Sequence, residues 1–361
     1  MSASVATFRL LPGRANRVAW LGMEDRAIHV VHVSPWRLPV SGYGGSQRVL
    51  TWLVRAQVEL GMRVTVFAPP GTKLPGAQVV EVTEQPTSQN FFRTIAEQLP
   101  LDAHLLHFQQ FPRLSAFPLP WVVTVHGNSP GELAPHPNKI FLSRDHAERS
   151  GSRFFVYNGL DPSEYLYRER KDDYFLFLAK VGRKSKGIDI ALRLARELGF
   201  RLVVAGGTRW DLRKTGGWWT SLRCRAEFLG EVDGREKAEL LANARALLFP
   251  IRWPEPFGLA VIEALVSGTP VITAPLGAMP EIVTPEVGFL CASPEEFRDA
   301  IRGVGELSSY ACRQRVLEHF THRHMARGYL EQYQRVLAGE GDANEKRLEE
   351  NKHSGNHANQ R

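Results

Sequence analysis

Short apolar runs alternate with longer amphipathic stretches along most of this chain. Five runs lie in its first half: HVVHVSP (29–35), RVTVFAPP (63–70), HLLHF (104–108), WVVTVHG (121–127) and KIFLS (139–143). Five more lie in its second half: YFLFLAKV (174–181), RLVVAGG (201–207), AEFLGEV (226–232), ALLFPI (246–251) and PVITAP (270–275). Runs that are apolar throughout are typical of strands buried on both faces of a parallel sheet.

Between these runs, apolar residues recur with the period of a helix, at 47–60, 188–198, 235–244 and 259–266. Alternating strands and helices predict parallel sheets covered by helices on both faces. The alternation occurs twice, on either side of the polar stretch LDPSEYLYRERKDD (160–173), which we interpret as a linker. The predicted fold class is therefore α/β, with two Rossmann-like, doubly wound parallel-sheet domains facing a central cleft.

The expected domain limits follow from this alternation. Residues 1–25 lack the basic, apolar and small-residue order of a signal peptide and are expected to be a loose leader. The first domain should cover 26–163 and the second 174–320, followed by a helix over 321–338 that can cross back to the first domain. Residues 339–361 contain almost no apolar side chains, so we expect a disordered polar tail.

Composition narrows the classes of function. The 361 residues are 43% hydrophobic and 23% charged, the balance of a globular protein, and contain no run of 18 apolar residues that would span a membrane. Three scattered cysteines suggest neither a disulfide framework nor a metal site, so a cytoplasmic location is expected. A net charge of +7 favours phosphate-bearing partners and leaves peripheral contact with the inner face of a membrane open. No nucleic-acid-binding motif is present, and no nucleic-acid partner is expected.

Ligands of doubly wound sheets bind beyond the carboxyl ends of the strands, so the loops that follow strands are the candidate site. In PVSGYGGSQRVL (39–50), Gly44 and Gly45 precede a helix whose free N–H groups could bind a phosphate. The loop does not match GxGxxG, and an ordinary glycine-rich turn is the alternative. His126 ends the strand of WVVTVHG; it either faces the cleft or is a buried structural histidine.

A cluster of cations follows the first strand of the second half. In LAKVGRKSKGIDIAL (178–192), Lys180, Arg183, Lys184 and Lys186 lie between a strand and a helix. Such a loop could neutralise a diphosphate, at about 1.5–3 kcal/mol for each charged hydrogen bond. The alternative is a solvated basic turn.

Two glutamates, Glu255 and Glu263, flank the start of a predicted helix in PEPFGLAVIEALVSGTP (254–270). The free N–H groups of Phe257, Gly258 and Leu259 should point at the ligand. Eight residues of helix span about 12 Å, close to the separation of the two sugars of a nucleotide diphosphate sugar. One carboxylate could then accept hydrogen bonds from the hexose and the other from the ribose. The alternative is a capping acid followed by an incidental surface glutamate.

These motifs together resemble a known family. EPFGLAVIE followed by ALVSGTPVI resembles the E-x7-E signature of retaining glycosyltransferases of family 4, the glycosyl transferases group 1, which have the GT-B fold. GYGGSQRV, TVHG, YNGLD and KG occur in the family's order, and the resemblance covers residues 27–337. It implies transfer of a hexose from a nucleotide diphosphate sugar to a sugar, lipid-linked or small-molecule acceptor, without a metal or another cofactor.

The resemblance also implies roles for single residues. Glu255 corresponds to the glutamate near the donor sugar, and Glu263 to the one that holds the ribose hydroxyls. Lys186 resembles the lysine on the diphosphate, and His126 the histidine near the reacting sugar. Gly44 and Gly45 resemble the loop close to the diphosphate or to an acceptor phosphate. The segment FLGEV, which includes Glu231, resembles the place where the family reads the base, so Glu231 is counted with the donor-binding residues.

The chain departs from the family pattern at one cation. Ala179-Lys180 stands where the family has Gly-Arg, so Lys180 keeps the charge but loses the bidentate fork, and Arg183 could replace it. Alternative functions are a nucleotide-sugar epimerase or phosphorylase, a catalytically inactive nucleotide-sugar-binding protein, and a nicotinamide oxidoreductase, which the missing GxGxxG disfavours. The base, the hexose and the acceptor stay open.

Overall fold

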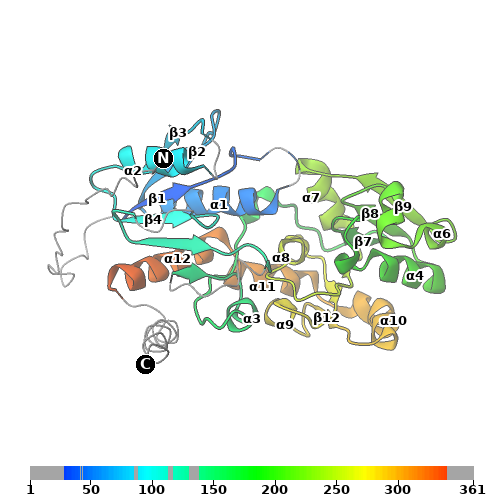
Figure 1. Cartoon of the computed structure of the whole chain (residues 1–361). Helices are drawn as coiled ribbons and strands as arrows, with labels where there is room; N and C mark the ends of the chain where they lie inside the picture. Colours follow the sequence, from blue (N-terminus) through cyan, green and yellow to red (C-terminus); the bar gives the residue numbers. More distant parts are fainter. Residues whose placement is uncertain are drawn as a thin grey trace, which may run out of the picture.

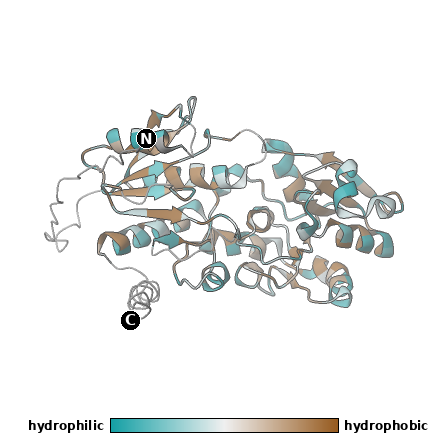
Figure 2. Cartoon of the chain, viewed as in Figure 1, coloured by the Kyte–Doolittle hydropathy of each residue, from teal (hydrophilic) through white to brown (hydrophobic). Residues whose placement is uncertain are grey.

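The computed structural model describes residues 28–40, 42, 44–84, 88–112, 117–129 and 138–339. The expected leader, and the expected tail beyond Gly339, lie outside these residues. The described chain forms two six-stranded parallel sheets with helices on their faces (Figure 1), which confirms the predicted doubly wound α/β class. Figure 2 shows hydrophobic residues along the strands and hydrophilic residues on the outer sides of the helices.

The first sheet has the strand order β3-β2-β1-β4-β5-β6. Its strands are β1 (His29–Val33), β2 (Arg63–Ala68), β3 (Gln78–Glu81), β4 (Leu105–Phe108), β5 (Trp121–Thr124) and β6 (Lys139–Ile140). The helices of this half are α1 (Gly45–Glu59), α2 (Gln89–Glu97) and α3 (Arg144–Glu148). Every residue of β1 and β4 is buried, as the unbroken apolar runs predicted.

The second sheet has the strand order β12-β11-β10-β7-β8-β9. Its strands are β7 (Phe175–Leu178), β8 (Leu202–Ala205), β9 (Ala226–Gly230), β10 (Ala246–Phe249), β11 (Val271–Thr273) and β12 (Gly288–Leu290). Its helices are α4 (Ile188–Leu198), α5 (Leu212–Thr215), α6 (Trp218–Ser221), α7 (Gly234–Asn243), α8 (Leu259–Val266), α9 (Met279–Ile282), α10 (Pro294–Gly303) and α11 (Ser309–His319). Short 3-10 turns cover 162–164, 184–186, 209–211 and 304–306.

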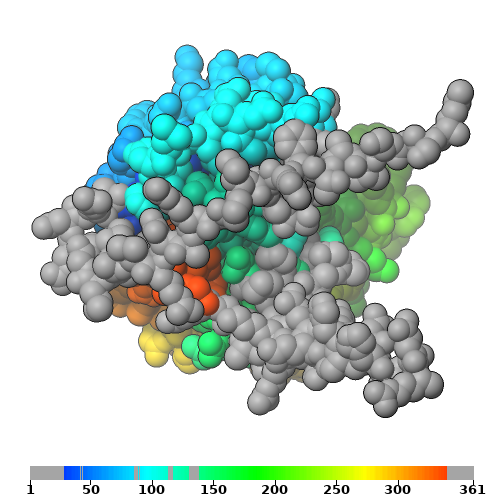
Figure 3. All heavy atoms as spheres, turned by 60° about the vertical axis from the view of Figure 1, so that its left-hand side comes forward, coloured from blue at the N-terminus to red at the C-terminus, as the bar shows by residue number. Residues whose placement is uncertain are grey.

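The last helix, α12 (His322–Leu337), returns to the first sheet and packs against α1 and β5. In the space-filling view its orange-red residues emerge beneath the blue and cyan first half of the chain (Figure 3). A buried polar chain holds it there. The Tyr333 hydroxyl accepts a hydrogen bond from Gln57 Nε2 (2.9 Å) and is hydrogen-bonded to His107 Nδ1 (2.7 Å). Thr124 Oγ1 is in turn 2.7 Å from both His107 Nε2 and the Tyr329 hydroxyl.

The polar segment 160–173 connects the two sheets, but it is more ordered than a plain linker. The Leu160 N–H donates to Phe320 O (3.0 Å), and the His322 N–H donates to Leu160 O (2.8 Å). The two crossings between the halves are therefore hydrogen-bonded to each other. No helix within the described residues is both long and apolar enough to cross a membrane.

Candidate functional site

A pocket of about 320 Å³ lies between the two halves, at the carboxyl ends of their strands. Eleven of the twelve candidate residues line it: Gly44, Gly45, His126, Arg183, Lys186, Glu231, Glu255, Phe257, Gly258, Leu259 and Glu263. Lys180 is not among the lining residues, whereas Arg183 is. Of the two cations that could replace the family arginine, the geometry therefore favours Arg183.

Glu255 and Lys186 are directly paired inside this pocket. Glu255 Oε2 accepts hydrogen bonds from Lys186 Nζ and from Trp253 Nε1, both at 2.6 Å. The two charged side chains are only 12% and 11% exposed. The Lys186 ammonium also lies 5.0 Å from the centre of the Trp253 ring and 5.4 Å from that of Phe249. The sequence patterns did not single out Trp253, which holds both members of the pair.

The backbone of the KG motif explains how Lys186 reaches this position. Gly187 has φ +76°, and a Cβ at this residue would lie 1.9 Å from Pro250 O, so only glycine fits between the turn and the end of β10. Gly258 has φ +95° and precedes α8, just as Gly187 precedes α4 with a left-handed backbone conformation. Neither α8 nor α1 has a side chain that caps its N-terminus. Both helix starts therefore present free N–H groups to the pocket, where an anion would be stabilised.

Glu263 has its own cation and a phenol. Its Oε1 accepts hydrogen bonds from Lys237 Nζ (2.5 Å) and from the Tyr165 hydroxyl (2.8 Å). Glu263 is 4% exposed. Burial, and then the charge of Glu263, raise the pKa of Tyr165 well above its usual range, so the phenol is neutral and donates. Sequence reasoning missed both partners, because Lys237 lies on α7 and Tyr165 in the supposed linker, each remote in sequence from Glu263.

His126 enters the pocket from the first half of the chain. Its Nε2 is 3.0 Å from Gln109 Oε1, and its ring makes an edge contact with Trp36 at 5.9 Å between centroids. Burial, together with the charge of His146, lowers the pKa of His126 to about 4. The imidazole is therefore neutral near pH 7, and the bond to Gln109 Oε1 makes Nε2 the protonated nitrogen.

The glycine-rich loop is tied across the pocket to the second half. The Gly42 N–H donates to Asp233 Oδ2 (2.8 Å), and Arg48 forms an ion pair with the other oxygen of the same carboxylate. Asp233 is also the N-cap of α7, the helix that carries Lys237. A Cβ at Gly45 would lie 3.0 Å from Leu259 Cδ1, so the starts of α1 and α8 nearly touch.

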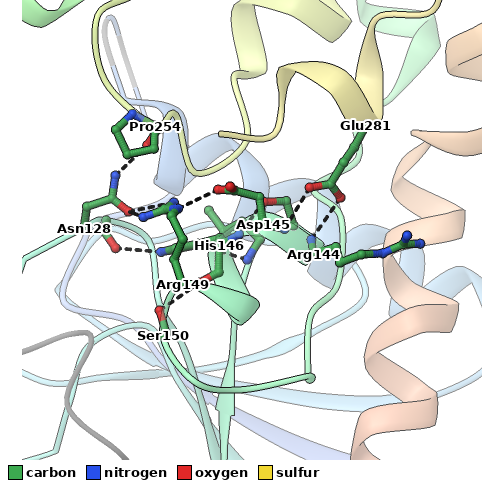
Figure 4. Close-up of polar contacts among 11 residues, drawn as sticks. Asn128, Arg144, Asp145, His146, Arg149, Ser150, Pro254 and Glu281 are labelled. Atoms are coloured by element: carbon green, nitrogen blue, oxygen red, sulfur yellow. Dashed lines mark hydrogen bonds and ion pairs between the residues drawn. The ribbon is translucent and has the colours of Figure 1, made fainter. Parts of the chain in front are cut away.

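A second set of contacts joins the halves beside the pocket (Figure 4). The Glu281 carboxylate on α9 accepts hydrogen bonds from the backbone N–H groups of Arg144 (3.0 Å) and Asp145 (2.8 Å), at the start of α3. Asn128 Nδ2 donates to Pro254 O (2.7 Å). Because Asn128 follows His126 by two residues and Pro254 precedes Glu255, this bond holds the two loops that carry these side chains close together.

The comparisons with known proteins agree with this geometry. Residues 166–315 match the family model described as glycosyl transferases group 1. This segment, which forms most of the second half, is therefore similar to the group 1 glycosyl transferases. The chain is 27% identical to AviGT4, a glycosyltransferase involved in avilamycin A biosynthesis, over 87% of this chain and 99% of that chain, with a TM-score of 0.70. The two facing sheets are therefore the GT-B fold that the resemblance implied.

Curated relatives match this chain over smaller shares of their length. An uncharacterized glycosyltransferase of Methanocaldococcus jannaschii is 30% identical over 45% of this chain, which spans 46% of that protein. A phosphatidyl-myo-inositol mannosyltransferase of Mycolicibacterium smegmatis is 26% identical over 70% of this chain and 77% of its own length. A structure titled as Anabaena HepE in complex with UDP-glucose shares the fold, with a TM-score of 0.64 at 15% identity.

Proposed function

We propose that this protein is a retaining glycosyltransferase of family 4 that moves a hexose from a nucleotide diphosphate sugar to an acceptor hydroxyl without a metal. The observation that carries the proposal is the pairing of the two glutamates of one pocket with two lysines, beside two uncapped helix starts. This arrangement offers separate partners for a sugar, a diphosphate and a ribose. We assign donor binding to the domain at 174–320 and acceptor binding to the domain at 26–163.

Each lining residue then has a chemical role. Lys186, Arg183 and the N–H groups at the start of α8 would stabilise the charge that grows on the diphosphate as the bond from its oxygen to the anomeric carbon breaks. Glu255 would hold hydroxyls of the hexose, and Glu263 those of the ribose. The acceptor oxygen would bond to the anomeric carbon on the face that the diphosphate leaves, and its proton would pass to the departing phosphate oxygen. Neither glutamate is assigned as a nucleophile.

The neutral His126 would act as a hydrogen-bonding group near the transferred sugar, because its low pKa leaves it uncharged at neutral pH. Glu231 and the neighbouring pocket residues Gly206 and Val232 follow β8 and β9 and would face the base. One relative is named as a phosphatidyl-myo-inositol mannosyltransferase. Its name favours a lipid-linked acceptor for this chain, together with a cytoplasmic location peripheral to the membrane.

A thermal-shift screen of nucleoside diphosphates and their sugars would identify the donor, and an incubation with that donor would test the chemistry. Slow release of free sugar from the donor, lost in Glu255→Gln, supports the transferase. An epimerised donor would support the epimerase instead, and tight binding without turnover the inactive binding protein. NMR of the product's anomeric centre tests retention, and activity in the presence of a chelator tests independence from metals.

A further inference from the structure

Three large apolar side chains on the connection between β8 and β9 are exposed to solvent. Trp210 is 61% exposed, Trp219 72% and Leu222 55%. We call these three residues the tryptophan face. α6, which carries Trp219, lies at the edge of the second half that points away from the first half (Figure 1). Leu222 is the C-cap of α6 and follows Trp219 by three residues, and the Trp210 ring lies 4.9 Å from the ring of Trp218 on the same helix, so one short connection carries all three side chains. Large apolar side chains that gather on a surface usually mark a contact with a partner.

Cations surround the tryptophan face. The Arg213 guanidinium lies 4.5 Å from the ring centroid of Trp210 and 5.7 Å from that of Trp218. Arg213 is exposed, as are Lys214, Arg223 and Arg225. Asp211 is the single acid of the connection at 206–225, and Glu227 on the following strand β9 pairs with Arg201 (2.7 Å). The surface therefore combines indole rings, an aliphatic side chain and an excess of positive charge.

The segment beneath this face is firmly held. Arg209 donates to Ser221 O (2.7 Å) and Ala226 O (3.0 Å), and its guanidinium lies 5.0 Å from the Phe228 ring centroid. Leu212 is fully buried below it. The exposure of Trp219 is thus a feature of the folded connection and not of a fraying end.

We propose that the tryptophan face docks on the surface of an anionic phospholipid bilayer. Tryptophan favours the boundary between headgroups and acyl chains, where its ring is apolar and its N–H stays hydrated. Leu222 has no polar group and gains only from an apolar partner, which favours acyl chains over a nucleic acid. Each basic residue held near an anionic leaflet strengthens binding by about fivefold. This docking goes beyond glycosyl transfer and does not require it.

The connection that bears the face begins at the donor pocket. Gly206 and Arg183 line that pocket, Trp210 follows Gly206 by four residues, and Lys214 Cδ lies 3.9 Å from where a Cβ on Gly182 would be. Docking by this face would therefore hold the donor-side domain, and not only an acceptor loop, at the membrane.

Vesicle sedimentation of the full chain tests the docking. Vesicles with about 30 mol% phosphatidylglycerol should bind the protein, and raising the salt from about 0.1 to 0.5 M should release it. The double variant Trp219→Ser/Leu222→Ser should bind about tenfold more weakly. The matched control Leu101→Ser/Tyr310→Ser removes two large side chains that are 107% and 61% exposed elsewhere on the surface, and it should bind like the parent.

Three results would overturn the proposal: no binding of the parent to anionic vesicles, equal binding by the Trp219→Ser/Leu222→Ser variant, or equal losses in the test and control variants. Tighter, salt-sensitive binding to single-stranded or duplex oligonucleotides, lost in the same variant, would assign the face to nucleic acid instead. Nucleotide-induced thermal shifts should be the same in parent and variant. A protein that docks but transfers no sugar would contradict the proposed function alone.

Discussion

Replacing Glu255 by glutamine should tighten the binding of a free nucleoside diphosphate, although it should lower turnover. In the structure Lys186 Nζ is bonded to Glu255 Oε2 at 2.6 Å, in a pair whose side chains are 11% and 12% exposed. A diphosphate must compete with this carboxylate for the ammonium. Glutamine keeps a hydrogen-bond acceptor for Lys186 but removes the negative charge of the carboxylate. The side chain at position 255 therefore competes less strongly with the diphosphate for the ammonium, but it no longer binds the hexose hydroxyls as a carboxylate.

The size of the effect follows from this bond. A hydrogen bond to a charged group contributes about 1.5–3 kcal/mol, and one without the negative charge roughly half of that. Freeing Lys186 should therefore add about 1 kcal/mol, or roughly fivefold in affinity. Inorganic pyrophosphate should gain as much as the nucleotide, because the competition concerns the phosphates alone.

Glu263→Gln should behave differently, because we place Glu263 at the ribose. The substitution should lower the affinity for the nucleoside diphosphate by about tenfold relative to the affinity for pyrophosphate, because one charged hydrogen bond to the ribose is lost. Isothermal titration calorimetry of both ligands measures the ratio. Glu236→Gln, an exposed residue on α7, makes the same charge change and should alter neither affinity. If Glu255→Gln weakens nucleotide binding as much as Glu263→Gln does, the two carboxylates do not divide the donor as proposed.

Three further results are expected. Lys186→Ala should cut transfer about 100-fold, or 2.7 kcal/mol, while Lys184→Ala, two residues away and exposed, should stay near the parent in the same assay. Burial lowers the pKa of His146 from 6.5 to about 4. Between these pH values the unfolded chain binds a proton at His146 that the folded chain does not, so the free energy of unfolding should fall as the pH drops from 6.5 to 4. Urea titrations of His146→Gln should show a smaller loss of this free energy over the same pH range. Tyr333→Phe leaves two buried polar partners unpaired and should lower the urea-derived free energy of unfolding by about 1–3 kcal/mol; an unchanged midpoint would contradict the role of the polar chain beneath α12.

The strands buried on both faces were predictable, because an unbroken apolar run needs no partner to be recognised. All ten predicted strands are present, and the helices predicted at 188–198 and 259–266 end where expected. The strands β3 and β12 were missed. Each has only three or four residues, and β3 is partly exposed at the edge of its sheet, so its apolar signal is weak.

The candidate site was predictable for a different reason. Parallel strands bring their carboxyl ends to one edge, so loops far apart in sequence converge there, and His126 and Glu255 line one pocket. The partners of these side chains were not predictable. In the sequence alone, Trp253 looks like an aromatic residue of the core, and Lys237 like a charged residue on the exposed face of a helix. Only the fold places Trp253 beside Glu255 and Lys237 beside Glu263.

The two lysine–glutamate pairs suggest how the pocket could link recognition of the diphosphate to recognition of the sugar. If Lys186 turns to a phosphate, Glu255 keeps the Trp253 N–H, at 2.6 Å, and can offer the lone pair that the lysine leaves to a sugar hydroxyl. Glu263 would stay bonded to Lys237 and Tyr165 through Oε1, so its orientation would not depend on the phosphates. Oε2 of the carboxylate assigned to the hexose would thus gain a free lone pair when the diphosphate binds, whereas the bonds that orient the carboxylate assigned to the ribose would not change.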